Sequence, residues 1–150
     1  MKTKLFTLFV LLIGVLISAT GCNSEPASAS TEVPPEAVVQ SYYDWYLSYI
    51  GDRFSDNFRN PLVDRAYRDS EQLSPAFVEK IDALLDSFNG AGYDPFLCAQ
   101  DIPTRITVQE ATVTGDSAST VVNTDFFNHQ FGVYLLKVDG AWKISDIVCR

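Results

Sequence analysis

The spacing of apolar residues changes once along the chain, and this change restricts the fold more than any other feature of the sequence. In residues 35–51 and 74–90 the apolar residues recur every three or four positions, which is the period of an α-helix. After the loop from Gly92 to Pro103 they alternate with polar residues, which is the period of a β-strand. Helices followed by consecutive strands predict an α+β domain, with the helices packed on an antiparallel sheet.

The helical part contains signals for two helices. The first is predicted from Pro35 up to Gly51, and the second from Pro75, with Ser74 as its N-cap and Gly90 at its end. Residues 52–73 are expected to be irregular, with one or two helical turns. The apolar face of the first helix is largely aromatic: Val38, Tyr42, Trp45, Tyr46 and Tyr49.

The second part predicts a four-stranded antiparallel meander. Gly115-Asp116 and Asp139-Gly140 are typical of tight hairpin turns, and a looser turn is expected around residues 128–130. The predicted strands are residues 105–113, 117–127, 132–138 and 141–148.

The start of the chain has the pattern of an export signal. Lys2 and Lys4 precede an apolar run over residues 5–17, and small residues then lead to Cys22. A membrane-spanning helix needs about 20 apolar residues, so a permanent transmembrane helix is the weaker interpretation. We therefore expect residues 1–21 to be a signal peptide.

The segment Ala19-Thr20-Gly21-Cys22 resembles the lipobox of bacterial lipoproteins, although Ala19 stands where a larger aliphatic residue is usual. The resemblance implies that acyl chains such as palmitate on Cys22 anchor the protein to the cell envelope. Residues 22–35 would be a flexible tether, and Asn23 favours the outer membrane, facing the periplasm, in a host with two membranes. An ordinary cleavage that releases a soluble protein remains the alternative.

Residues 36–150 are expected to form a single domain held by one disulfide. With Cys22 acylated, Cys98 and Cys149 remain as a pair in an exported chain, where disulfides persist. The alternative is two unrelated buried thiols. His129 is the only histidine, and one histidine with two cysteines falls short of a structural zinc site, so we expect neither a metal nor another cofactor.

Several segments of this domain together resemble an uncharacterised family of exported and lipid-anchored bacterial proteins, the domain of unknown function 3828. The closing motif is also similar to cone-shaped folds of the nuclear transport factor 2 (NTF2) type. The resemblance therefore implies a curved sheet wrapped by helices, which could enclose an aromatic pocket. The matching segments are Tyr43-Asp44-Trp45-Tyr46-Leu47, Leu73-Ser74-Pro75 with Ile81, Asp94-Pro95-Phe96, Gln100-Asp101-Ile102-Pro103 and Asp139-Gly140-Ala141-Trp142-Lys143-Ile144.

Four residues are candidates for contact with a ligand or partner. Tyr43 and Tyr46 lie on the aromatic helix, and Tyr43 falls off its main apolar stripe, so we expect it to be the more exposed. Asp94 and Asp101 flank the cysteine loop and could act as acid and base, but Asp94 before a proline is also typical of a turn, and Asp101 could simply cap backbone amides. His129 is a candidate base, but its position in a turn favours a surface role. No residue is assigned a catalytic role.

The formal net charge of −8 disfavours nucleic acid and anionic lipid headgroups as partners. The first interpretation is a lipid-anchored envelope protein whose domain binds a protein or small molecule without catalysis. One alternative is a small hydrolase or isomerase with an aromatic and carboxylate pocket. The other is an immunity-type inhibitor of an envelope toxin, since an acidic surface suits a basic target.

Overall fold

The computed structural model describes residues 32–52, 54–87 and 92–149, so the predicted signal peptide, Cys22 and most of the predicted tether lie outside it. In the described part, helices α1 (Pro35–Ile50) and α2 (Pro75–Ser87) flank a short 3-10 helix, η1 (Ala66–Asp69), and a sheet follows. The α+β class is therefore confirmed. The strands are β1 (Ile106–Val108), β2 (Thr112–Thr114), β3 (Ser117–Thr124), β4 (Gln130–Val138) and β5 (Ala141–Cys149).

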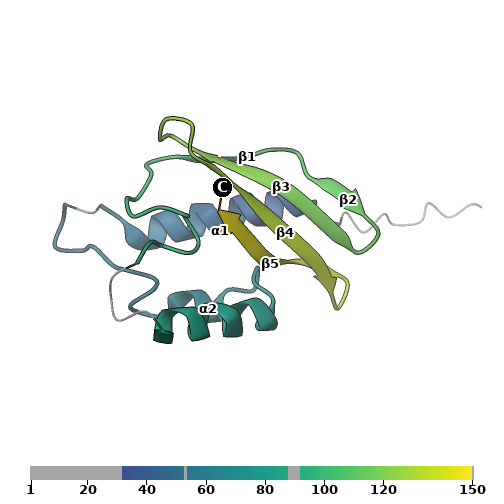
Figure 1. The fold of residues 1–150 in the computed structure, drawn as a ribbon, viewed down its shortest axis with the longest axis horizontal. Coiled ribbons are helices and arrows are strands. Elements are labelled where there is room, and N and C mark those ends of the chain that lie inside the picture. The colour runs from purple at the N-terminus through teal and green to yellow at the C-terminus, as the bar shows by residue number, and fades with distance from the viewer. Residues whose placement is uncertain (1–31, 53, 88–91, 150) are drawn as a thin grey trace, which may run out of the picture. The chain divides into compact units, whose positions relative to one another are not determined.

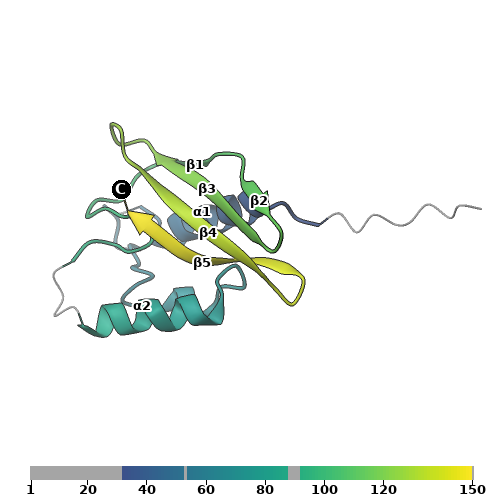
Figure 2. The same cartoon turned by 45° about the vertical axis from the view of Figure 1, so that its right-hand side comes forward.

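Helix α1 lies across one face of the sheet and α2 lies next to β5 (Figures 1 and 2). Within the described residues, neither helix has the length and apolar character needed to cross a membrane. Helix α1 begins with Pro35 at its first position. It ends at Gly51, whose φ of 65° lies in the left-handed region and whose N–H donates to the Leu47 carbonyl.

Helix α2 begins as the sequence predicts. The Ser74 hydroxyl accepts a hydrogen bond from the Phe77 N–H at 3.3 Å, and the Ser74 N–H donates to the Ile144 carbonyl at 2.9 Å. The N-cap therefore also attaches the start of α2 to the edge of β5. Phe77 and Ile81 are the buried residues of this helix. The predicted end at Gly90 lies outside the described residues.

The sheet has five strands rather than four. Its order is β1-β3-β4-β5, and β2 pairs with the same strand, β3, as β1 does. The predicted strand over residues 105–113 is thus two short strands in line. Val108 pairs with Val122 and Thr112 with Ser119, so the β1–β2 side has one residue more than β3 between these pairs. This extra residue is a bulge, which a pattern of alternating residues does not reveal.

The core is mainly aromatic, and its centre is a residue of the loop before the sheet. Phe96 is fully buried. Its ring lies 5.3 to 6.0 Å, centroid to centroid, from those of Tyr42, Tyr46, Tyr67 and Phe77. Such ring pairs stabilise a core beyond the area that they bury. The loop is therefore part of the core and connects α1, η1 and α2.

The predicted disulfide is present. Cys98 in this loop is bonded to Cys149 at the end of β5, with the two Cα atoms 5.4 Å apart. The bond fixes the loop to the last strand, next to Phe131 on β4, which pairs with Cys149.

At the opposite end of β4, the first described residue is attached to the sheet. The Glu32 carboxylate forms a 2.9 Å ion pair with the Lys137 ammonium, which also lies 4.9 Å from the centre of the Trp142 ring. The chain therefore enters the domain beside the β4–β5 turn.

Candidate functional site: a cleft beside the disulfide loop

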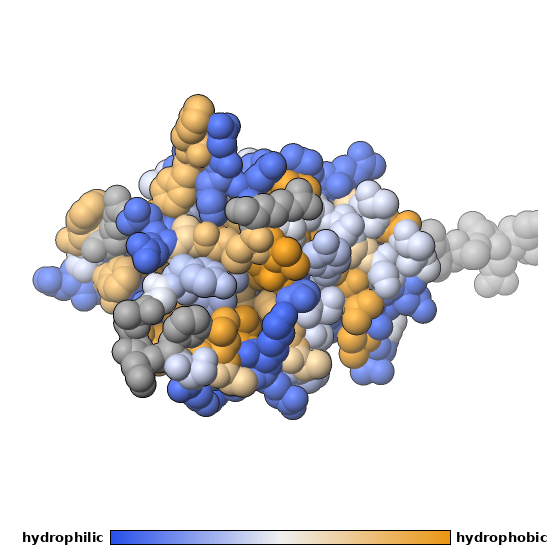
Figure 3. All heavy atoms as spheres, viewed as in Figure 1, coloured by the Kyte–Doolittle hydropathy of each residue, from blue (hydrophilic) through white to orange (hydrophobic). Residues whose placement is uncertain are grey.

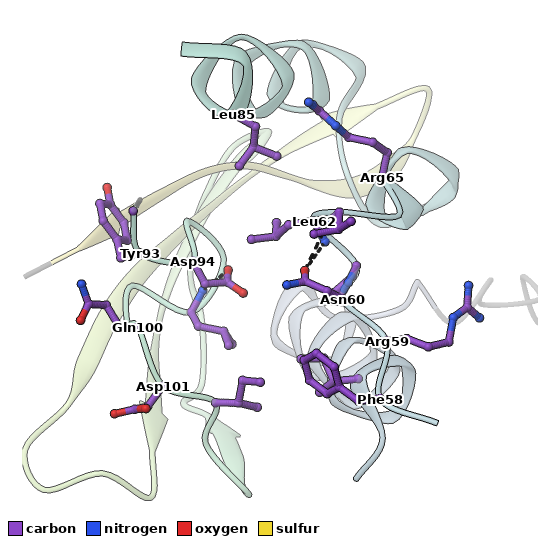
Figure 4. Close-up of a pocket in the computed structure, with 16 residues that line it drawn as sticks. Phe58, Arg59, Asn60, Leu62, Arg65, Leu85, Tyr93, Asp94, Gln100 and Asp101 are labelled. Carbon is purple, nitrogen blue, oxygen red and sulfur yellow. Dashed lines mark hydrogen bonds between the residues drawn. The ribbon is translucent and has the colours of Figure 1, made fainter. Parts of the chain in front are cut away.

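A cleft of about 420 Å³ lies between the segment 58–65 and the loop 92–102 (Figure 4). Ile50 of α1 and Leu85 of α2 also line it. Volumes of this size are typical of small-molecule sites and of pockets that receive one side chain of a partner. Exposed apolar groups border the opening, among them Val63, whose side chain is 77% exposed.

Asp94 lies on the loop side of this cleft and organises the loop. Its Oδ1 accepts hydrogen bonds from the N–H groups of Phe96 and Leu97, at 2.8 and 3.1 Å. Its Oδ2 accepts one from the Tyr46 hydroxyl at 2.6 Å. Because a carboxylate oxygen can accept two hydrogen bonds, Oδ2 retains the capacity for one more donor. The turn that the sequence suggested at Asp94, which precedes Pro95, is therefore observed, since the Leu97 N–H also donates to the Asp94 carbonyl at 3.2 Å.

Burial raises the pKa of the Asp94 carboxyl above its ordinary value, and the hydrogen bonds from Tyr46 and the two backbone N–H groups oppose this rise. Burial and the nearby Asp94 charge also raise the pKa of the Tyr46 phenol. The pair thus consists of a neutral phenol and a carboxyl group that is protonated more readily than an exposed aspartate.

The expectation that Tyr43 is the exposed tyrosine of α1 is wrong. Its side chain is fully buried, and its hydroxyl donates to the Phe96 carbonyl at 2.8 Å. The disulfide loop and Phe131 cover this side of α1, so a position off the main stripe is also part of the core. Tyr46 is likewise fully buried, and its link to the cleft is the hydrogen bond from its hydroxyl to Asp94.

Asp101 also lines the cleft, but it does not form a pair with Asp94. Its side chain is exposed, and in Figure 4 its carboxylate points away from the cleft, whereas Asp94 points toward Asn60 on the opposite wall. The structure therefore places both predicted carboxylates at one site, with Asp94 facing the cleft and Asp101 turned away from it.

The wall formed by residues 58–65 is the part of the site that the sequence did not predict. This wall begins with a turn at Asn60, whose side-chain oxygen accepts a hydrogen bond from the Leu62 N–H at 2.9 Å. Arg65 then bonds to Asp82 and Asp86 of α2 at 3.1 and 2.7 Å, and these ion pairs hold the wall against α2. The Asn60-Pro61 dipeptide, a common turn signal, could have indicated this segment.

His129 lies outside the cleft and is half-buried. One ring nitrogen is 3.1 Å from the Thr124 hydroxyl, and the other is 3.1 Å from the Cys98 carbonyl oxygen. The first contact lies within the turn after β3, and the second holds this turn against the disulfide loop. Among the described residues, no group of three histidine, cysteine or acidic side chains is placed to hold a metal ion.

No protein-family model matches the sequence, and no curated protein matches it either. The fold is similar to one chain in the crystal structure of the type VI native effector–immunity complex Tae3–Tai3 from Ralstonia pickettii. The TM-score is 0.54 and the sequence identity is 26%, over 77% of this chain and 94% of that chain. The similarity thus spans nearly all of a protein that takes part in an effector–immunity complex.

Proposed function

We propose that this protein is an immunity-type protein, which binds an effector toxin in the cell envelope and blocks it without performing a reaction. The observation that carries the proposal is the similarity to a chain of the Tae3–Tai3 effector–immunity complex, which covers 94% of that chain. The similarity supports a protein as the partner of this domain.

The immunity role is supported over the effector role because the candidate reactive side chains are engaged in contacts that hold the fold together. Cys98 and Cys149 are joined in a disulfide, and the two ring nitrogens of His129 lie in hydrogen bonds that brace a turn. Asp94 caps the backbone of its loop. These groups stabilise a rigid scaffold, and an inhibitor requires only a scaffold and a binding surface.

The location that we propose fits this role. The lipobox-like segment ending in Cys22 would retain the protein at the membrane of the cell that makes it, which is where protection against an envelope toxin is needed. The net charge of −8 would favour encounter with a basic partner. The membership of the domain of unknown function 3828 family and the NTF2-like cone are further parts of the proposal, supported by the quoted motifs.

A competition experiment between sister cells tests the function and does not require the toxin to be identified first. A deletion strain is grown in contact with its parent, and with a parent whose type VI secretion is inactivated. We expect the deletion strain to be recovered in lower numbers only beside the secreting parent, and the full-length chain to restore its recovery. Equal recovery of the deletion strain beside both parents would overturn the proposal.

Binding of a small molecule in the cleft is the second candidate, and the spare hydrogen-bonding capacity of Asp94 favours it. A role of this kind would be needed whether or not a competitor is present. A growth defect of the deletion strain in pure culture, restored by the wild-type chain and not by Asp94→Asn, would support it. Normal growth in pure culture under envelope stress would argue against it.

A further inference from the structure

The turn between β3 and β4 carries an exposed aromatic side chain that the fold does not use. We call residues 125–129 the hairpin tip. Phe127 in this tip is 93% exposed, more than any other large hydrophobic residue among the described residues. Figure 3 shows the tip as a projection from the surface, with hydrophobic and hydrophilic residues side by side.

The base of the tip is fixed by the segment that precedes β1. The Asp125 carboxylate accepts hydrogen bonds from the Thr104 N–H, at 3.1 and 3.3 Å to its two oxygens, and from the Thr104 hydroxyl. The Asp125 N–H donates to the Arg105 carbonyl at 3.2 Å. The tip is therefore held on this side by both backbone and side-chain bonds.

The other side of the tip is braced by the disulfide loop. The His129 ring lies between Phe126 and Phe131, with centroids 6.0 and 5.9 Å away, and one of its nitrogens lies 3.1 Å from the Cys98 carbonyl oxygen. Asn128 takes a left-handed conformation with φ of 55°, which asparagine tolerates better than most residues. The exposed ring is thus presented by a structured turn.

An exposed aromatic on a rigid support has the properties of an interface anchor. Aromatic residues are enriched among the residues that dominate binding energy, and a preorganised turn loses little conformational freedom when it binds. A lipid surface fits poorly, because the chain has a net charge of −8 and the tip carries Asp125. We propose that Phe127 anchors this domain to its protein partner, by entering an apolar pocket with a polar rim on the effector. The inference rests on the proposed function and names the surface that performs it.

The competition between sister cells tests the assignment with variants of the full-length chain. Phe127→Ala should lower the recovery of the complemented deletion strain, since loss of an anchor residue weakens the affinity for the partner by about tenfold or more. Phe127→Tyr, which keeps the ring, should restore protection. Val113→Ala is the matched control, because Val113 is 51% exposed on β2 and lies neither at the tip nor at the cleft. Val63→Ala, at a residue 77% exposed beside the cleft, reports on the cleft instead.

The outcomes separate the two proposals. If the wild-type chain itself gives no protection, the proposed function is wrong, and the anchor assignment falls with it. If wild type and Phe127→Ala protect equally, the function stands and only the tip assignment is wrong. Loss of protection with Val63→Ala and not with Phe127→Ala would assign the interface to the cleft instead.

Folding and self-association are checked on the purified domain. Because Phe127 is exposed, Phe127→Ala should keep the disulfide and a melting temperature close to that of the wild type. An unfolded Phe127→Ala variant would make Phe127 a structural residue and overturn the proposal. A wild-type dimer that Phe127→Ala converts to a monomer would assign the tip to a second copy of this chain, which would also overturn it.

Discussion

The hydroxyl of Tyr46 donates a 2.6 Å hydrogen bond to Oδ2 of Asp94 and so joins helix α1 to the disulfide loop. Tyr46 is fully buried and Asp94 is half-buried, and Asp94 in turn fixes the backbone N–H groups of Phe96 and Leu97. The position of Phe96 at the centre of the core therefore depends on a partly buried polar pair.

Removal of the Tyr46 hydroxyl should destabilise the domain. Tyr46→Phe leaves one oxygen of a half-buried carboxylate without this donor, so we expect a loss of about 1–3 kcal/mol in the free energy of unfolding. Urea denaturation of the oxidised domain measures this loss. Tyr49→Phe is the control, since the hydroxyl of Tyr49 bonds to Asp64 at an exposed site and its removal should cost much less. Equal losses for the two variants would contradict the prediction.

The stability of the domain should depend on pH through Asp94 in an unusual direction. Its pKa in the folded state is raised above the ordinary value of 3.8, so the folded state holds this proton more tightly than the unfolded state. The stabilising contribution of the proton is complete below pH 3.8 and is lost as the pH rises through the folded-state pKa. The stability of wild type relative to Asp94→Asn should therefore fall across this range of pH.

Asp125 provides a control of opposite sign. Its pKa is lowered, chiefly by the Thr104 hydroxyl, so its contribution is present above the ordinary value of 3.8 and is lost as the pH falls through the folded-state pKa. The stability of wild type relative to Asp125→Asn should thus fall as the pH is lowered. Parallel pH profiles for the Asp94 and Asp125 variants would refute the assignment.

Loss of the disulfide should cost about 2–4 kcal/mol in the free energy of unfolding, as expected for a loop of this length. The double variant Cys98→Ala/Cys149→Ala and the reduced wild type should give similar urea midpoints. A reductant should leave the midpoint of the double variant unchanged. A wild-type midpoint that is insensitive to reduction would show that the bond contributes little to stability.

Acylation of Cys22 is tested by mass spectrometry of the protein extracted from membranes. We expect a mature chain that begins at Cys22 and carries two or three acyl chains, with the Cys98–Cys149 bond intact. Cys22→Ala should remain unacylated, and its precursor should retain residues 1–21. A soluble mature protein with a free Cys22 thiol would favour the ordinary cleavage.

The sequence predicts the parts of the fold that depend on local signals. Pro35 and Gly51 bracket α1, and Ser74 and Pro75 start α2, because proline and capping residues act within one helical turn. The disulfide also follows from the number of cysteines once Cys22 is set aside.

Features that depend on distant contacts could not be predicted in this way. The burial of Tyr43 requires the disulfide loop to fold over α1. Likewise, the cleft wall is held by ion pairs between Arg65 and α2. The sequence around Arg65 does not indicate which distant acidic residues it contacts. The division of the first strand reflects one extra residue opposite β3.

The ion pair between Glu32 and Lys137 has a consequence for how the domain is presented. It fixes the entry of the chain at the last residues of β4, whereas Phe127 lies in the turn just before the first residue of β4, and the nine residues of this strand separate its two ends by about 30 Å. If Cys22 carries the lipid, the tether joins the domain at its Glu32 end, and Phe127 lies at the other end of β4 from that attachment. The length of the tether would then set how far into the periplasm the protein can intercept an incoming toxin.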